Sequence, residues 1–156
     1  MSDRPKQRRG ILGVGNVLLC DEGAGVHAVR RLERSGAPPG ISLFDGGIEG
    51  FGLMDIVAEQ DRLVVIDCVR GGEEPGTIYR FEAEDVTAAP DRYQTSLHQV
   101  GILEILHFVE LVGRRPRTTV VGIEPLRVEI GEKLSDLVAA RLPRLGELAI
   151  EQVLAD

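Results

Sequence analysis

The sequence has no tryptophan, only four phenylalanines and two tyrosines, and only two cysteines, Cys20 and Cys68. Two cysteines do not supply the disulfide framework on which small secreted domains depend, so reduced thiols are expected. Long apolar runs are also missing, because no stretch reaches the roughly 20 residues that span a bilayer. The charged amino terminus is not followed by the apolar stretch and cleavage site of a secretory signal. These absences predict a cytoplasmic protein without a membrane segment.

Positive charge is in short supply as well. The chain has 18 Lys and Arg residues against 25 Asp and Glu, and this net charge of −7 argues against nucleic-acid binding through phosphate contacts. The exception is a basic cluster in residues 1–9, which we interpret as a flexible tail because like charges without apolar partners do not fold. The remaining residues, 10–156, suit one domain with its own hydrophobic core.

Apolar runs of strand length alternate with helical patterns along the rest of the chain. Strands are expected at residues 11–14, 41–44, 63–66, 77–81 and 118–123, and helices at about 23–34, 51–60, 96–112 and from 135 onward. The alternation predicts an α/β fold, a three-layer sandwich in which a mostly parallel, twisted, mixed sheet of about five strands carries helices on both faces. The link before residues 77–81 is too short for a parallel crossover, so that strand is expected to be antiparallel.

Three segments carry more specific expectations. Residues 82–95 contain Pro90 and show no clear period, which predicts an irregular and exposed stretch. The next helix is expected to begin at Ser96 as its N-cap, and its apolar residues wrap most of its circumference, which predicts deep burial. Pro143 lies within the last helical pattern and is expected to kink that helix or split it in two.

Carboxylates follow three of the predicted strands. Asp21 and Glu22 come after the turn Gly13-Val14-Gly15, Asp45 follows the second strand, and Asp67 follows the third. The carboxyl ends of parallel strands meet at one edge of a sheet, where the loops leave a crevice. We therefore expect these acidic side chains to line a site at that edge.

Three side chains have the chemistry of metal ligands. Glu22 and Asp67 offer carboxylate oxygens, and His98, at a predicted helix start, offers an imidazole nitrogen. Such a set suits a borderline ion such as Zn²⁺ or Ni²⁺, with coordination positions left open for another ligand. From the residues alone a structural role is the alternative, because acidic residues at strand ends often stabilise turns.

Five sequence blocks follow one another in chain order: GVGNVLLCDEG, FDGGIEG, IDC followed by PGTIYRF, SLHQVG, and VGIEP. In this order they resemble the signature blocks of the hydrogenase maturation endopeptidases, which trim the carboxyl terminus of the large subunit of nickel-iron hydrogenases. The resemblance extends over about residues 11–153. It implies that residues 10–156 form a peptidase domain and that its partner is the large-subunit precursor, rather than a nucleic acid or a membrane.

The resemblance also implies a role for the three metal-ligand side chains. It identifies Glu22, Asp67 and His98 as a triad that recognises the nickel already inserted in the precursor. Nickel is then carried by the substrate, and no permanent cofactor is expected. An incomplete oxygen and nitrogen ligand set binds a free ion weakly, yet adds favourable energy when the substrate brings its own thiolate-bound metal.

Other positions are expected to support this site. Asp45 matches a further acidic position of the family pattern, and with Gly46, Gly47 and Asn16 it is expected to orient the substrate tail or to support a ligand. Glu124, in the block VGIEP, stands where an uncharged amide is expected in many relatives. If the side chain faces the site, it adds a negative charge near the tail-binding surface. If it faces solvent, it adds no charge there.

The chemistry of cleavage is left open by the residues. The sequence has neither the HExxH helix of metalloproteases nor the GxSxG turn of serine hydrolases. An aspartic-type mechanism and a metal-assisted one, in which a carboxylate activates water beside a metal-polarised carbonyl, are both compatible with Glu22 and Asp67 as catalytic residues. Cys20 and Cys68 lie close to these residues in the sequence, but we interpret them as small buried side chains.

Two other functions remain as alternatives. Gly13 and Gly15 follow a strand as in a dinucleotide-binding turn, but Leu18 stands where the third glycine of GxGxxG is required. Two carboxylates at the following helix start would also repel a pyrophosphate. The second alternative is a non-catalytic module on the same fold that senses metal or acts as a chaperone, because a fold by itself does not define an activity.

Overall fold

The protein is built on one five-stranded mixed sheet with the strand order β2-β1-β3-β5-β4. The computed structural model describes residues 5–88 and 101–156. The strands are β1 Arg9–Val14, β2 Ile41–Gly47, β3 Arg62–Cys68, β4 Ile78–Glu82 and β5 Arg117–Ile123. All five predicted strands are present, and the sheet begins at Arg9, the last residue assigned to the tail.

The pairing follows the sequence pattern. Strands β1, β2, β3 and β5 run parallel to one another, while β4 pairs with β5 in the antiparallel direction, which confirms the expected mixed sheet. All seven residues of β3 are buried, because this strand is central and covered on both faces.

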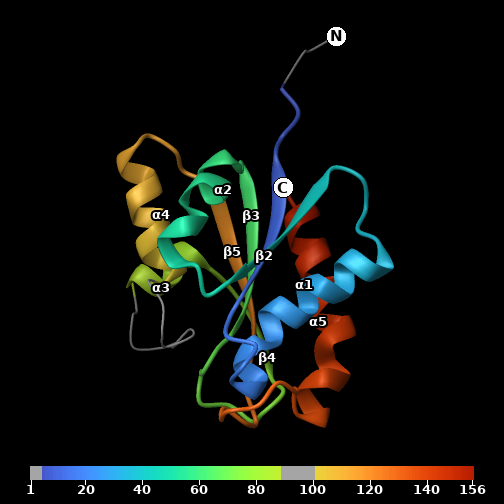
Figure 1. Cartoon of the computed structure of the whole chain (residues 1–156). Coiled ribbons are helices and arrows are strands. Elements are labelled where there is room, and N and C mark those ends of the chain that lie inside the picture. Colours follow the sequence, from blue (N-terminus) through green and yellow to red (C-terminus); the bar gives the residue numbers. More distant parts are fainter. Residues whose placement is uncertain (1–4, 89–100) are drawn as a thin grey trace.

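Helices cover both faces of the sheet and make three layers (Figure 1). Helices α1 and α5 contact each other on one face, and α2 and α4 contact each other on the other. The bounds are α1 Ala24–Ser35, α2 Met54–Glu59, α3 Ala83–Ala88, α4 Ile102–Leu111 and α5 Asp136–Leu154, with short 3-10 helices η1 at Cys20–Gly23 and η2 at Gly50–Leu53. The predicted α/β sandwich is confirmed. No helix within residues 5–88 and 101–156 is both long enough and apolar enough to cross a membrane.

The alternation of side chains along β3 divides the core into two halves. Leu63 and Val65 pack with residues of α2 and α4, whereas Val64 and Ile66 pack with residues of α1 and α5. Each such side chain contributes about 1.5–3 kcal/mol when it is fully removed from water. Burial on both faces therefore fixes the position of the strand that ends in Asp67.

Three local expectations are wrong. Residues 83–88 form α3 in the stretch predicted to be irregular, and Glu84 and Asp85 in its first turn favour a helix start. Helix α4 begins only at Ile102, and it is not deeply buried, since Leu111 is 68% exposed. One stripe of α4 packs on the core while its other side stays exposed. The predicted N-cap Ser96 lies outside the described residues.

Helix α5 runs through Pro143 without being split. The proline removes the N–H partner of the Ala139 carbonyl, and both residues are exposed, so water can take that bond. Leu145, Ala149 and Val153 on the buried side of α5 hold the second half of the helix against the core.

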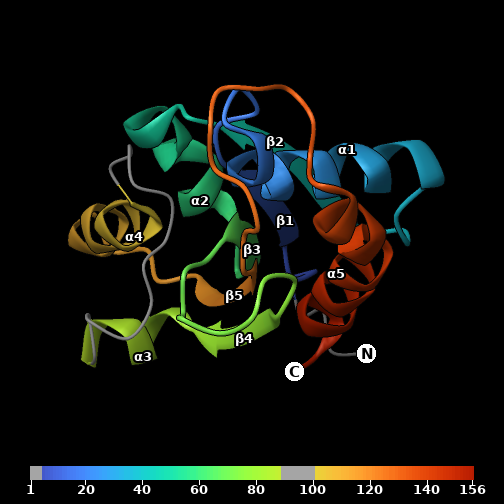
Figure 2. The same cartoon turned by 90° about the horizontal axis from the view of Figure 1, so that it is seen from below.

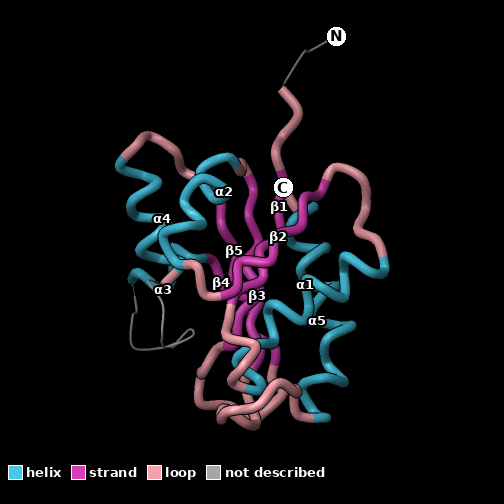
Figure 3. The backbone as a smooth tube through the Cα atoms, in the orientation of Figure 1, coloured by secondary structure: helices cyan, strands magenta, loops and turns pink. Residues whose placement is uncertain are grey.

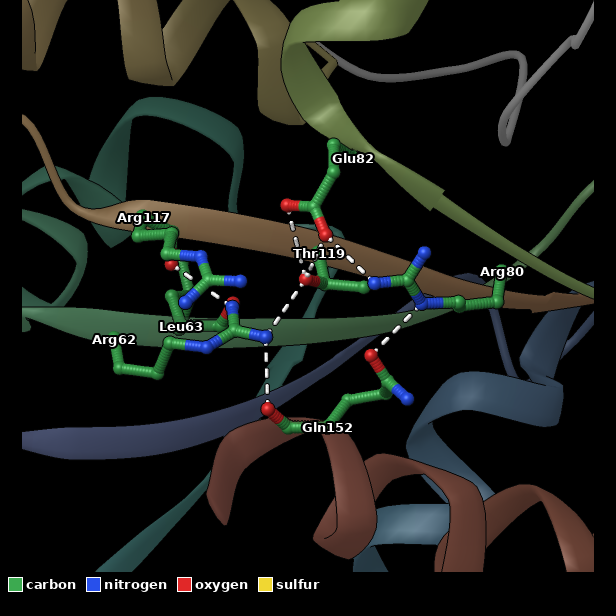
Figure 4. A network of polar contacts seen from close by, with 7 residues as sticks. All are labelled: Arg62, Leu63, Arg80, Glu82, Arg117, Thr119 and Gln152. Atoms are coloured by element: carbon green, nitrogen blue, oxygen red, sulfur yellow. Dashed lines mark hydrogen bonds and ion pairs between the residues drawn. The ribbon is translucent and has the colours of Figure 1, made fainter. Parts of the chain in front are cut away.

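A buried arginine organises the amino edge of the sheet (Figure 4). Arg62, at the start of β3, is 1% exposed. Its guanidinium donates four hydrogen bonds, to the carbonyls of Leu63 at 3.1 Å, Arg117 at 3.1 Å and Gln152 at 2.8 Å, and to the Thr119 hydroxyl at 2.8 Å. The Thr119 hydroxyl in turn donates to the Glu82 carboxylate. The network links three strands and α5 at the edge opposite the acidic side chains.

Candidate functional site at the carboxyl edge of the sheet

Three loops gather at the carboxyl edge of the parallel strands, which Figure 2 views from below. They follow β1, β3 and β5, and Figure 3 shows all three at the same end of the molecule. Each loop follows a strand whose core position is fixed, so the side chains at their roots are held in place.

The turn after β1 brings η1 and α1 unusually close to the sheet. A Cβ at Gly15, where φ is +134°, would lie 2.0 Å from the Glu22 carbonyl oxygen. A Cβ at Gly25 would lie 2.1 Å from the Ile66 carbonyl oxygen. These positions require glycine because no side chain fits in the gap. The consequence is that Glu22, in η1, lies against the end of β3 that carries Asp67.

This turn leaves no room for the dinucleotide alternative. The N–H of Gly15 donates to the Gly47 carbonyl at 2.9 Å, so it is not available to a phosphate. Asp21 and Glu22 are both buried where a pyrophosphate would approach the helix start.

Glu22 is a buried carboxylate without a hydrogen-bond partner among the described residues. The residue is 2% exposed, and both Oε1 and Oε2 lack a donor within residues 5–88 and 101–156. Removing a carboxylate from water without compensation is unfavourable, so such a group requires an explanation beyond its own fold. A site that is completed by another molecule provides one.

Asp21 has the opposite environment, and we were wrong to expect it at the site. It is fully buried, and its two oxygens accept four hydrogen bonds from the backbone N–H groups of Leu126, Arg127 and Ser135 and from the Ser135 hydroxyl. These four hydrogen bonds hold the loop that follows β5 and the start of α5. Asp21 is therefore a structural residue, and Glu22 beside it is the functional candidate.

Asp67 lies within β3, one residue before its end, and is 2% exposed. Its Oδ1 accepts the Cys68 N–H at 2.8 Å. Burial raises the pKa of the Cys68 thiol, and the charges of Asp67 and then Glu22 raise it further. The raised pKa keeps the Cys68 thiol protonated near neutral pH.

The third member of the predicted triad lies outside the described residues. His98 belongs to residues 89–100, so the structure does not test its position. Within residues 5–88 and 101–156 there is no group of three or more His, Cys, Asp or Glu side chains arranged to hold a metal ion. Glu22 and Asp67 are the described residues that could contribute oxygen ligands to an incoming metal.

The supporting residues take positions that partly differ from expectation. Asp45 lies inside β2, which continues to Gly47. Its carboxylate accepts from the Nε of Arg30 on α1 at 2.9 Å and so forms an ion pair between β2 and α1. A register shift between Gly13 and Val14 accompanies this longer strand. The extension was not predicted because glycines normally end strands, whereas here they form an irregular pairing.

Two other supporting residues shape the turn after β1. Gly47 adopts a φ of +47° and its carbonyl accepts the N–H of Gly15. Asn16 is half-buried, and its Oδ1 accepts the Leu18 N–H at 2.9 Å. Both residues border the segment that leads into Glu22, and their described contacts are within the protein.

Glu124 faces the protein interior, which resolves the orientation left open by the sequence. It is 7% exposed, and its carboxylate accepts the N–H groups of Gly71 at 3.1 Å and Gly72 at 3.0 Å. Its backbone N–H donates to Thr77 at 2.8 Å, and its carbonyl accepts from Gly76 at 2.9 Å. Glu124 therefore clamps the loop between β3 and β4.

The arrangement offers carboxylate chemistry at a defined edge. One acid, Asp67, is stabilised by a backbone N–H, and the other, Glu22, is desolvated without a described partner. Pairs of acids in unlike environments are suited to general acid and base roles and to weak metal coordination.

Comparisons with known proteins bear on this geometry. The family model HycI, described as hydrogenase maturation protease, matches residues 26–152. The hydrogenase expression/formation protein HupD from Rhizobium leguminosarum bv. viciae is 36% identical over 149 residues, which cover 94% of this chain and 74% of that protein. HupD from Rhodobacter capsulatus is 37% identical, with 85% of this chain and 64% of that protein covered. The hydrogenase 2 maturation protease of Escherichia coli K12 is 36% identical, with 93% and 87% covered.

Solved structures agree with these relatives. The hydrogenase maturating endopeptidase HybD from E. coli has a TM-score of 0.79 and 35% identity, covering 95% of this chain and 90% of its own. The maturation protease HybD from Thermococcus kodakarensis has a TM-score of 0.80 and 26% identity, covering 93% and 98%. The fold and the sequence therefore point to the same group of proteins.

Proposed function

This chain belongs to the hydrogenase maturation protease family, and we propose that it removes the carboxyl-terminal extension of a nickel-iron hydrogenase large-subunit precursor after nickel insertion. The observation that carries the proposal is the buried, unpartnered carboxylate of Glu22 beside the strand end that bears Asp67. In this proposal the protein works in the cytoplasm and acts without a resident cofactor.

Nickel is a feature of the substrate in this proposal. The oxygens of Glu22 and Asp67, together with His98, form a ligand set that is incomplete by itself. A precursor that already carries thiolate-bound nickel completes the set, and the added coordination energy selects it over a precursor without metal. Desolvation of Glu22 strengthens its interaction with an arriving cation, because charges attract more strongly away from water.

The cleavage step uses one of the two carboxylates as the base. In the metal-assisted route, nickel polarises the scissile carbonyl and the base takes a proton from the attacking water. In the aspartic-type route, the two acids divide the work between activating water and protonating the leaving amide nitrogen. Both routes require Glu22 and Asp67 at one edge of the sheet and a bond presented between them.

The test is a cleavage assay followed by mass spectrometry of the precursor. The purified chain is expected to shorten a nickel-loaded large-subunit precursor at one bond, and Glu22→Gln, Asp67→Asn and His98→Ala are each expected to abolish this. Glu33→Gln, an exposed acid on α1, is the matched control and should cleave normally. Binding of the precursor without any shortening would instead identify a non-catalytic metal-sensing or chaperone module.

A further inference from the structure

Three large aliphatic side chains are exposed on two loops beside the candidate site. Leu18 is 55% exposed, Leu126 is 54% exposed and Ile130 is 93% exposed. Single exposed aliphatic residues are common on protein surfaces and need no explanation. These three side chains differ from isolated exposed residues, because hydrogen bonds join the two loops that carry them.

The backbone beneath these side chains is firmly held. The Cys20 N–H donates to the Gly131 carbonyl at 2.9 Å, and the Gly131 N–H donates to the Leu18 carbonyl at 2.9 Å. Leu19 and Gly131 form a parallel bridge. The loop after β1 is thus paired with the residue next to Ile130, and the exposure of these side chains does not come from a loose loop.

The buried carboxylate of Asp21 fixes the other end of the same surface. It accepts the N–H of Leu126 at 2.9 Å and that of Arg127 at 2.8 Å, and the Asp21 N–H donates to the Arg127 carbonyl at 3.0 Å. Glu22 is the next residue along the chain. The surface of Leu18, Leu126 and Ile130, which we call the aliphatic rim, is therefore rigidly connected to the proposed catalytic carboxylate.

The charges on the loop that carries Leu126 and Ile130 are balanced. Residues 125–133 contain two basic and two acidic side chains, and Arg127 pairs with Glu129 at 3.5 Å. A balanced, aliphatic surface favours contact with a folded protein surface over a charged ligand. A preformed surface also reduces the conformational entropy that is lost on binding, because the loops that carry its side chains are already ordered.

We propose that the aliphatic rim is the docking surface for the folded body of the hydrogenase large-subunit precursor. This inference rests on the proposed function. A peptide bond cut at Glu22 must be brought to this edge of the sheet, so the protein that carries the bond must also cover the loops that border Glu22. The rim then supplies affinity for the substrate body, while Glu22 and Asp67 act on its tail.

The test compares two charge substitutions at exposed aliphatic residues. Ile130→Glu places a charge on the rim. Leu111→Glu, at a residue 68% exposed on α4, is the matched control, because the C-terminal end of α4 leads by a short turn to the amino edge of the sheet. Leu126→Ser is a second rim variant that adds no charge. Circular dichroism confirms that each full-length variant is folded.

Both cleavage and binding of the nickel-loaded precursor are measured. Ile130→Glu is expected to raise KM and the dissociation constant about tenfold with little change in kcat, whereas Leu111→Glu behaves as wild type. Wild-type affinity of Ile130→Glu for the precursor, or equal weakening by both charge variants, overturns the inference. So does a wild-type dimer that Ile130→Glu converts to monomer while KM stays unchanged.

The two proposals fail in different ways. Wild-type protein that binds the precursor but leaves it uncut contradicts the protease function, and the binding data for Ile130→Glu still decide the role of the rim. Normal cleavage by wild type with unchanged KM in both rim variants contradicts only the docking surface.

Discussion

Asp21 holds Ser135 through both of its carboxylate oxygens, although the two residues are 114 positions apart in the sequence. Oδ1 accepts the Ser135 N–H at 2.7 Å, and Oδ2 accepts the Ser135 hydroxyl at 2.8 Å. The Ser135 Oγ in turn accepts the Val138 N–H and caps α5. The segment that leads into Glu22 is thereby tied to the start of the last helix.

Replacing Asp21 by Asn is expected to destabilise the protein. The asparagine keeps the shape but presents an amide N–H₂ where backbone and hydroxyl groups donate, so at least one donor loses its acceptor. The free energy of unfolding should fall by about 2–4 kcal/mol, which urea denaturation measures. Unchanged stability would show that the loop is held by other contacts.

Replacing Glu22 by Gln is expected to abolish cleavage without destabilising the protein. A neutral side chain removes a buried charge that lacks a described partner, so stability should be unchanged or should rise by about 1 kcal/mol. Cleavage of the precursor should be lost, because the amide is neither a base nor an anionic ligand. A large loss of stability in this variant would mean that Glu22 is structural.

Replacing Glu124 by Gln is expected to loosen the loop after β3. The glutamine NH₂ group would face a backbone N–H of Gly71 or Gly72, so one of the two hydrogen bonds is lost. The free energy of unfolding should fall by about 1–3 kcal/mol. Asp67 lies only four residues before Gly71, so loosening this loop should disturb the Asp67 carboxylate and lower kcat/KM as well. Glu129→Gln, an exposed acid of the neighbouring loop, is the control, and an equal effect there would argue against a clamp.

Replacing Arg62 by Met tests the amino edge alone. Four oxygens lose their donor, so the free energy of unfolding should fall by about 3 kcal/mol. Arg80→Met removes a half-exposed arginine of the same network and should change stability by about 0.5 kcal/mol. The folded Arg62 variant should still cleave normally, because the network lies opposite the site.

His27 predicts a specific dependence of stability on pH. Burial lowers the pKa of His27, with contributions from the nearby positive charges of Arg30 and Arg34. Above the unfolded value of about 6.5 the residue is neutral in both states. As pH falls below this value, the unfolded state takes up a proton before the folded state does, so stability decreases until the lowered pKa is passed. In His27→Gln this part of the stability curve should be flatter, which denaturation at several pH values measures.

The sequence was sufficient to predict the architecture because buried strands carry strong local signals. The run Leu63–Ile66 is apolar and β-branched, so a central strand ending near Asp67 followed directly. Short elements with mixed composition were harder. Helix α3 depends on acidic residues in one turn, and β2 continues through glycines because neighbouring strands supply its pairing.

The site was predictable only to the level of its edge. Asp21 and Glu22 are neighbours with similar chemistry, and their opposite environments depend on Ser135, which is close to Asp21 only in the folded chain. The direction of Glu124 depends likewise on the N–H groups of Gly71 and Gly72 on another loop. Such partners are set by tertiary structure and leave no trace in local spacing.

The most direct measurement compares the cleavage rates of one large-subunit precursor with and without its nickel, using wild-type protein and Glu22→Gln. The account predicts that wild type shortens only the nickel-loaded precursor and that Glu22→Gln shortens neither. Equal cleavage of both precursors by wild type, or wild-type cleavage by Glu22→Gln, would contradict it.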